Sequence, residues 1–244
     1  MKTVLVTAGG TFEPVDAVRM LGNRSTGATG SAIALAAHER GWNVTLLLSQ
    51  HSPCAGPWPF EVIRFVTHHD LERQMHERID EGGPTAVIHS AAVADYQVAG
   101  VYPGDSHGPK IEPAHAFAPE KKIPGSEHSL WLKLTPLPKI LGKIRKEWRF
   151  SGLLVSFKLE QGTDLFTRAR ENLLSSGSDL VVANTWEDHT REAFFVIADR
   201  HGLAMPTMNA AAAGIATEQK IPRQELPARI MEFLESCHVG SPVQ

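Results

Sequence analysis

The chain has 244 residues, of which 42% are hydrophobic and 21% charged, and its formal net charge of −3 provides no general attraction for nucleic acid or an anionic membrane. Met1-Lys2-Thr3 leads directly into a strand-like run, so we expect no signal peptide, and no apolar run approaches the length of a membrane span. These values predict a cytoplasmic globular protein with no nucleic-acid or membrane partner.

Short apolar runs alternate with amphipathic stretches along the chain. The predicted strands cover residues 4–6, 43–48, 86–92, 153–158, 180–183 and 194–197, and the predicted helices cover residues 31–40, 69–81, 137–146, 165–175 and 227–236. Strands that alternate with helices predict an α/β fold with a doubly wound, mainly parallel, Rossmann-like sheet and right-handed crossovers. Ligands bind such sheets beyond the carboxyl ends of the strands.

Residues 96–136 interrupt this alternation. They are rich in Gly, Pro and His and end in the alternating stretch SLWLKL. Such a segment inside a compact domain indicates a functional loop or a subdomain. No linker divides the chain, so we predict a single domain over residues 1–244 with an inserted loop or β subdomain at 96–136.

Two glycine-rich turns lie near the beginning of the chain. Their spacing fits neither the dinucleotide fingerprint nor the Walker pattern, because Ala28 stands where the Walker lysine is required. Gly9-Gly10 alone is at least as typical of an ordinary strand–helix turn as of phosphate binding. The second turn, Gly27 to Gly30, follows polar residues and precedes a predicted helix, which favours anion binding at the helix N-terminus. A helix capped by Ser or Thr is the alternative.

Other polar residues stand at predicted strand ends or in the insertion. Ala91 and Ala92 leave space for a ligand at such an end, and Asp95 is equally compatible with binding a substrate or capping a turn. Asn184 could contact a ribose or a base, or only close a turn. Lys122 alone indicates nothing, because surface lysines are common. The twelve histidines are scattered, so we expect no metal site built from protein side chains.

Several motifs occur together in the order and spacing of one family: TAGGT, E-P-V-D-x-V-R, GNRSTG, AAVADY, KIPGS before SLWLKL, SFKLE and DLVVAN. On these motifs the chain resembles phosphopantothenoylcysteine synthetase (phosphopantothenate–cysteine ligase), from about Val4 to the predicted closing helix. The SFKLE stretch is similar to the free-standing form of that family, which has no decarboxylase half.

The resemblance implies a ligase of coenzyme A biosynthesis that works in two steps. The carboxylate of 4'-phosphopantothenate attacks a nucleoside triphosphate to give an acyl-nucleotidylate and pyrophosphate, and the amine of L-cysteine then displaces the nucleotide. The resemblance also implies Mg²⁺ with the triphosphate, no flavin, a homodimer, and an active-site flap and dimer contact at residues 96–136. SFKLE favours ATP by resemblance, although CTP serves many bacterial members, so the choice stays open.

The resemblance also assigns site residues. The nucleotide-binding positions are Gly9, Ser25, Gly27, Gly30, Phe157 and Asn184, and the phosphopantothenate-binding positions are Asn23, Ala91, Ala92 and Asp95. Arg19 is expected to reach the substrate phosphate in the neighbouring subunit. The catalytic positions are Asn23, over the acyl phosphate, and Lys122, which stabilises the activated phosphate. No residue is assigned to a metal.

Three alternatives remain. Residues 101–117 are an insertion relative to shorter relatives, so Lys110-Ile111 competes with Lys122-Ile123 as the catalytic pair, and the distance to LWLKL favours Lys122. An NAD(P)-binding reductase on a Rossmann-like fold is the second, although no acidic residue closes the run 43–50 and no Tyr-x-x-x-Lys pair is present. A binding module without activity is the third, and the presence of Asn23, Asp95 and Lys122 argues against it.

Overall fold

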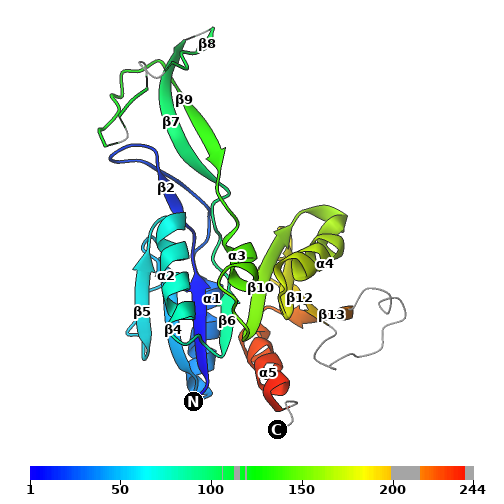
Figure 1. Ribbon diagram of the computed structural model, residues 1–244. Helices are drawn as coiled ribbons and strands as arrows, with labels where there is room; N and C mark the ends of the chain where they lie inside the picture. Colours follow the sequence, from blue (N-terminus) through cyan, green and yellow to red (C-terminus); the bar gives the residue numbers. More distant parts are fainter. Residues whose placement is uncertain (106, 113–115, 119, 199–214, 240–244) are drawn as a thin grey trace.

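The computed structural model describes residues 1–105, 107–112, 116–118, 120–198 and 215–239. Its centre is an eight-stranded sheet with helices on both faces (Figure 1). The strands are, in sheet order, β13 (Ile215–Pro222), β12 (Glu192–Ala198), β11 (Leu180–Thr185), β10 (Leu153–Glu160), β6 (Ala86–His89), β1 (Thr3–Ala8), β4 (Asn43–Ser49) and β5 (Glu61–Phe65).

The sheet confirms the predicted doubly wound, mainly parallel fold. All strands from β11 to β5 are parallel, whereas β12 and β13 are antiparallel to their neighbours. The chain runs from β1 outward to β4 and β5, and then returns to β6 on the other side of β1 before it continues to β10. The strand order therefore reverses between β1 and β6, and a crevice at the carboxyl ends of these strands is the expected ligand site.

Five helices cover the two faces of the sheet in the described part of the chain. α1 (Ala28–Glu39) and α5 (Leu226–Val239) pack on one face, and α2 (His68–Asp80), α3 (Ile140–Lys146) and α4 (Leu165–Ser176) pack on the other. The apolar side chains of α2 recur at helical spacing, and Thr67 with Asp70 forms a capping box at its start. Gly177, with φ of 66°, ends α4 in the left-handed conformation that glycine adopts easily.

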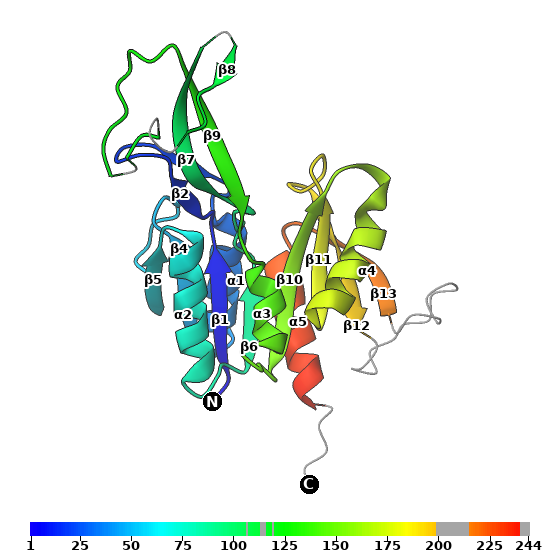
Figure 2. The same cartoon turned by 45° about the horizontal axis from the view of Figure 1, so that its top comes forward.

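A second, smaller sheet projects from the carboxyl edge of the central sheet (Figure 2). We call residues 96–136 the arm: it contains β7 (Tyr96–Asp105), β8 (Gly108–Pro109) and β9 (Ser129–Pro136), with β7 and β9 paired antiparallel along their length. A hairpin of β2 (Phe12–Pro14) and β3 (Met20–Gly22) lies at the base of the arm. The inserted segment is therefore mainly a β-ribbon.

The sequence analysis missed several strands and misplaced some ends. β5, β13 and the β2–β3 hairpin were not predicted. β6 ends at His89 rather than at residue 92, because the N–H of Ala92 leaves the sheet and donates to the carbonyl of Gly9 at 2.9 Å. α3 begins at Ile140 rather than at residue 137, because Leu137 precedes Pro138 and a residue before proline disfavours helical backbone. The N–H of Leu137 instead donates to the carbonyl of Asp95 at 2.8 Å.

Candidate active site

A cleft of about 840 Å³ opens at the carboxyl edge of the sheet; we call it the cleft below. Its walls come from the loop between β3 and α1, the segment after β6, and the ends of β10 and β11. Many residues expected at a nucleotide or phosphopantothenate site line it: Asn23, Ser25, Gly27, Gly30, Ala91, Ala92, Phe157 and Asn184. Segments far apart in sequence are thus brought together at the reversal point of the strand order.

The first glycine turn lies behind the wall of the cleft and joins its other parts. Gly9 has φ of 90°, and Gly10 forms a parallel bridge with Ala92. A Cβ on Gly10 would lie 2.4 Å from the carbonyl oxygen of Asn23, a distance that no side chain tolerates. The turn therefore lets the loop after β3 and the segment after β6 approach each other, and glycine is required for that approach.

The N-terminus of α1 is open toward the cleft. Its N-cap residue is Gly27, with φ of 80°, and no side chain caps the helix. The alternative of a Ser or Thr N-cap is therefore not realised, although the hydroxyl of Thr26 accepts a hydrogen bond from the N–H of Ala28 at 3.3 Å. Free N–H groups and the helix dipole at such an end favour a bound anion. Gly30 has a packing role, since a Cβ there would lie 2.6 Å from Ala8 Cβ.

Asn23 connects two walls of the cleft. Its Nδ2 donates hydrogen bonds to the carbonyls of Ala92 at 3.3 Å and Val93 at 2.9 Å. Both amide hydrogens are thereby used, so Oδ1 is the polar atom of the side chain that stays available to a ligand. Asn23 thus fixes the position of the alanine segment and presents an acceptor.

Asp95 lines an adjoining cleft of about 490 Å³, which shares Ala91 and Phe157 with the first. Its carboxylate is exposed and forms an ion pair with Lys139, a residue that the sequence analysis did not single out. Among the described hydrogen bonds this carboxylate caps no turn, and its partner is the ammonium of Lys139.

The cleft is positively charged. Arg24, Lys158 and Arg223 line it, and no carboxylate is among its lining residues in the described ranges. Lys158 forms an ion pair with Glu160 at 3.1 Å, and this hydrogen bond holds the pKa of Glu160 below its ordinary value despite partial burial. A cleft of this composition is suited to a polyanionic ligand.

Aromatic rings line the cleft beside Asn184. Trp186 is 46% exposed, and its ring stacks on that of His189 with 5.2 Å between centroids. The sequence analysis missed both rings and Arg223. Trp186 and His189 follow a predicted strand, and Arg223 precedes the predicted closing helix. Many surface residues share such positions, so the sequence does not mark these three as site residues.

A buried histidine supports the floor of the site. The hydroxyl of Thr7 lies 2.9 Å from Nδ1 of His89 and accepts a hydrogen bond from the N–H of Ala91 at 3.1 Å. Burial, and secondarily the neighbouring His68, lowers the pKa of His89 to about 4. His89 is therefore neutral at physiological pH and holds the start of the alanine segment in place.

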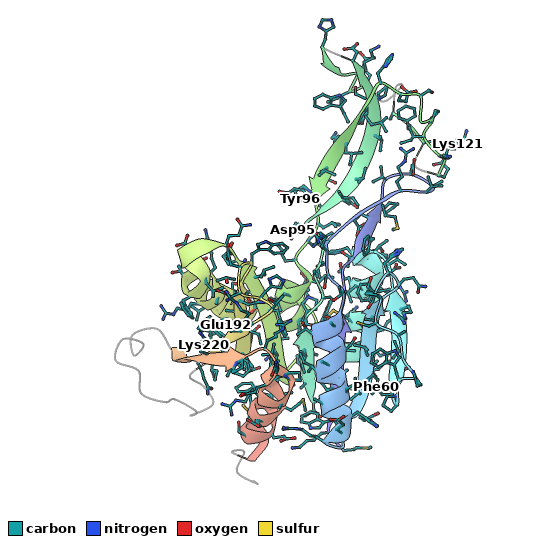
Figure 3. All side chains as sticks on the ribbon, turned by 180° about the vertical axis from the view of Figure 1, so that it is seen from behind. Phe60, Asp95, Tyr96, Lys121, Glu192 and Lys220 are labelled. Carbon is teal, nitrogen blue, oxygen red and sulfur yellow. The ribbon has the colours of Figure 1, made fainter. Side chains whose placement is uncertain are left out.

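Arg19 and Lys122 do not line the cleft of their own chain. Nη2 of Arg19 donates to the carbonyl of Ile123 at 3.0 Å, and the buried carboxylate of Asp16 accepts a hydrogen bond from the N–H of Ile123 at 3.0 Å. Lys122 is exposed beside this contact. Figure 3 shows the neighbouring Lys121 next to the β2–β3 loop, far from Asp95.

The competing pair Lys110-Ile111 lies in a different environment. Ile111 is 57% exposed, whereas Ile123 is 1% exposed. The N–H of Ile123 donates to Asp16, and its carbonyl accepts from Arg19. Lys110 is exposed near the turn of the ribbon and forms a 3.9 Å ion pair with Asp105. This difference favours Lys122-Ile123 as the pair with a fixed position.

No group of three His, Cys, Asp or Glu side chains that could hold a metal ion occurs in the described part of the chain. Within the same residues, no helix is both long and apolar enough to cross a membrane.

The chain is similar to curated proteins over about three quarters of its length. It is 33% identical over 193 residues to the coenzyme A biosynthesis bifunctional protein CoaBC of Mycobacterium tuberculosis, and 34% identical over 187 residues to the CoaBC of Thermococcus kodakarensis. Each alignment covers 75% of this chain and 41% of the relative, so the chain spans less than half the length of these relatives.

Solved structures show the same fold. The DNA/pantothenate metabolism flavoprotein of Streptococcus pneumoniae has a TM-score of 0.75 at 24% identity, with 97% of this chain and 99% of that chain covered. A Cab2 mutant in complex with phosphopantothenate-cysteine has a TM-score of 0.68 at 18% identity, with 98% of this chain and 88% of that chain covered.

The family model for the DNA/pantothenate metabolism flavoprotein C-terminal domain matches residues 1–107 and 113–232, which include the glycine turns, the cleft walls, most of the arm and the first half of α5. With a match over nearly the whole chain, the protein belongs to the DNA/pantothenate metabolism flavoprotein C-terminal domain family.

Proposed function

We propose that the protein is a phosphopantothenate–cysteine ligase of coenzyme A biosynthesis. The single observation that carries the proposal is the cleft. It combines an uncapped helix N-terminus and a cationic lining, with no carboxylate among its described residues, with Ala91 and Ala92, which the family resemblance assigns to phosphopantothenate, and Asp95 lines the adjoining cleft. The relatives named CoaBC and the Cab2 complex with phosphopantothenate-cysteine support the same substrate class.

The geometry suits a reaction in two steps. The phosphates of the nucleotide would lie at the N-terminus of α1 near Ser25 and Gly27, with the base and ribose near Phe157 and Asn184. Phosphopantothenate would lie along Ala91, Ala92 and Asp95, so that its carboxylate meets the α-phosphate where the two regions join. Positioning by the cleft walls and charge stabilisation by cations would supply most of the rate.

Each step balances without an outside oxidant or reductant. In the first, an oxygen of the phosphopantothenate carboxylate forms a bond to the α-phosphorus, and pyrophosphate leaves. In the second, the amine of cysteine forms a bond to the acyl carbon, the nucleoside monophosphate leaves, and the ammonium proton is lost. The free Oδ1 of Asn23 is placed to accept a hydrogen bond from that amine.

We propose that Mg²⁺ enters with the triphosphate. The uncharged polar groups of the described lining residues are hydroxyls, amides, two imidazoles and an indole rather than carboxylates, which fits a magnesium ion held mainly by phosphate oxygens and water. When bound, Mg²⁺ would neutralise charge on the phosphates.

We propose that the protein is a homodimer whose arm contributes to the partner's cleft. Both faces of β9 are exposed, including Leu130, Trp131, Leu132 and Leu134, and the adjacent hairpin exposes Met20 and Leu21. An apolar surface of this kind is typical of a subunit interface. Arg19 is hydrogen-bonded to Ile123, the neighbour of Lys122, and both Arg19 and Lys122 lie away from their own cleft, so both would complete the cleft of the partner.

The decisive test is turnover by the purified protein. Phosphopantothenate, cysteine and either ATP or CTP with Mg²⁺ should release pyrophosphate and yield phosphopantothenoylcysteine, identified by mass spectrometry. Pyrophosphate release that needs phosphopantothenate but not cysteine would reveal the first step by itself. Absence of product with both triphosphates would contradict the proposal. Sedimentation equilibrium tests the dimer separately.

The alternative of an NAD(P)-binding reductase has no support in the site. A dinucleotide fold places an acidic residue where β4 ends, to bind the ribose. Here that position is Ser49, which is buried and donates a hydrogen bond to the carbonyl of Gly10 at 2.7 Å.

A further inference from the structure

Arg223 is brought to the cleft by the direction of two antiparallel strands. β12 begins at the edge of the sheet where β11 ends, and β13 runs back to that same edge, where Pro222 pairs with Glu192. Arg223 is the next residue, and its N–H donates to the carbonyl of Arg191 at 2.8 Å. Its backbone is thus fixed at the carboxyl edge, and its side chain lines the cleft.

The guanidinium of Arg223 is partly buried beside the first turn of α1. It donates a hydrogen bond to the hydroxyl of Thr29, and no carboxylate lies within ion-pair distance of it in the ranges that the structure describes. Burial lowers the pKa of this guanidinium, although arginine remains charged at any physiological pH. A partly buried cation is unfavourable by itself when no described carboxylate pairs with it, so a bound anion would stabilise it.

We propose that Arg223 binds the phosphates of the nucleoside triphosphate, beside the N-terminus of α1. The proposal rests on the proposed function for the identity of the ligand. One edge of the planar guanidinium is held by Thr29, and its other N–H groups can donate to two phosphate oxygens at once. Asp95 lines the adjoining cleft, and Arg223 does not. Arg223 would therefore act on the nucleotide and not on phosphopantothenate.

Calorimetric titration tests this without turnover. The full-length protein and its Arg223→Gln variant are titrated with MgATP, MgCTP and inorganic tripolyphosphate. Arg223→Gln removes hydrogen bonds between charged groups. We therefore expect a roughly 10- to 100-fold loss of affinity, both for the triphosphate that the wild type binds and for tripolyphosphate. Arg223→Lys should recover only part of the affinity, because lysine keeps the charge and loses the planar fork.

The matched control is Lys220→Gln. Lys220 lies on β13, three residues before Arg223, is exposed, and forms a 2.6 Å ion pair with Glu192 (Figure 3), but it does not line the cleft. This variant removes one positive charge close to Arg223 in the chain and should leave triphosphate affinity unchanged. The affinity of all variants for phosphopantothenate, measured in the same way, should also be unchanged.

The outcomes separate this inference from the proposed function. If the wild type binds triphosphate but shows no ligase turnover, the proposed function is refuted. The role of Arg223 in triphosphate binding can still be measured in that case. Equal affinity of wild type and Arg223→Gln would overturn the inference, as would a loss that Lys220→Gln reproduces or that extends equally to phosphopantothenate. A wild type that binds neither triphosphate nor tripolyphosphate would also overturn it. If Arg223→Gln does not fold, Arg223→Lys provides the test: a partial loss of triphosphate affinity supports the inference, and unchanged affinity overturns it.

Discussion

The carboxylate of Asp16 bonds to the backbone of Ile123, more than a hundred residues away in the chain. Oδ2 accepts the N–H of Ile123 at 3.0 Å, and Oδ1 accepts the N–H groups of Val18 at 3.0 Å and Arg19 at 2.7 Å. Burial opposes the charged form, but these hydrogen bonds and the nearby Arg19 outweigh it and hold the pKa of Asp16 below its ordinary value. Asp16 therefore holds the backbone of Arg19 next to the peptide bond between Lys122 and Ile123.

The first prediction concerns this contact. Asp16→Asn removes the charge, and its NH2 group, a donor, then faces the N–H of Ile123 or of Arg19, so that one hydrogen bond is lost. A lost buried hydrogen bond of this kind costs about 1–3 kcal/mol, so we expect the rate of pyrophosphate release to fall roughly 10- to 100-fold. Stopped-flow measurement of the first step provides the rate.

A double-mutant cycle tests whether Asp16 acts through Lys122. In the Lys122→Gln background, Asp16→Asn should lower the rate by much less than in the wild type. Independent, multiplicative losses would show that Asp16 only stabilises the fold.

The second prediction uses mixed dimers. If Arg19 and Lys122 both complete the partner's cleft, subunits with Arg19→Ala and subunits with Asp95→Ala should regain activity when mixed, because one intact site forms. Lys122→Gln with Asp95→Ala should behave in the same way. Arg19→Ala with Lys122→Gln should regain none, because each cleft then lacks either Arg19 or Lys122 from its partner. Recovery in that last pair would show that Lys122 serves its own subunit.

The third prediction separates the two candidate lysines. Lys122→Gln should slow the first step on the order of 10²–10³-fold and change nucleotide affinity little, because its charge matters most in the transition state. Lys110→Gln is the control: the Lys110 side chain is exposed and forms an ion pair with the exposed carboxylate of Asp105. Single-turnover rates and calorimetric affinities for both variants provide the comparison. A damaging Lys110→Gln with a silent Lys122→Gln would reverse the assignment.

The sequence predicted the sheet type and most cleft walls, because buried parallel strands and glycine turns leave local patterns. It did not predict β13, and hence Arg223, because the position of an edge strand depends on pairing with β12 rather than on local periodicity. Nor could it place Lys122 relative to Arg19. That relationship depends on the hydrogen bonds of Asp16 and Ile123, which only tertiary structure brings together.

The fourth prediction concerns the second step. Asn23→Asp replaces Nδ2, which donates to the carbonyls of Ala92 and Val93, with an oxygen that would repel them, and it adds negative charge near the acyl phosphate. We expect cysteine transfer to be lost more than nucleotidylation, so that the acyl-nucleotidylate accumulates. Mass spectrometry of quenched reactions detects that intermediate. Full turnover by this variant would contradict the role of Asn23.

The last prediction concerns stability and pH. His89 has a pKa of about 4 in the folded protein and an ordinary value of 6.5 when unfolded. Between these values the unfolded chain binds the proton and the folded protein does not, so unfolding becomes easier as pH falls. The contribution is fully present above about pH 6.5 and is lost by about pH 4. Its size is about 3 kcal/mol, at about 1.4 kcal/mol for each unit of pKa.

Urea unfolding at several pH values measures this contribution. His89→Gln keeps a hydrogen-bonding partner for Thr7 and has no titrating group, so its free energy of unfolding should fall less than that of the wild type between pH 6.5 and pH 4. NMR titration of the wild type provides an independent value, since the His89 ring resonances should not shift above about pH 5. Identical pH dependence of the two proteins, or a ring that titrates near pH 6.5, would show that His89 is accessible to protons in the folded state and does not hold the alanine segment as a buried neutral side chain.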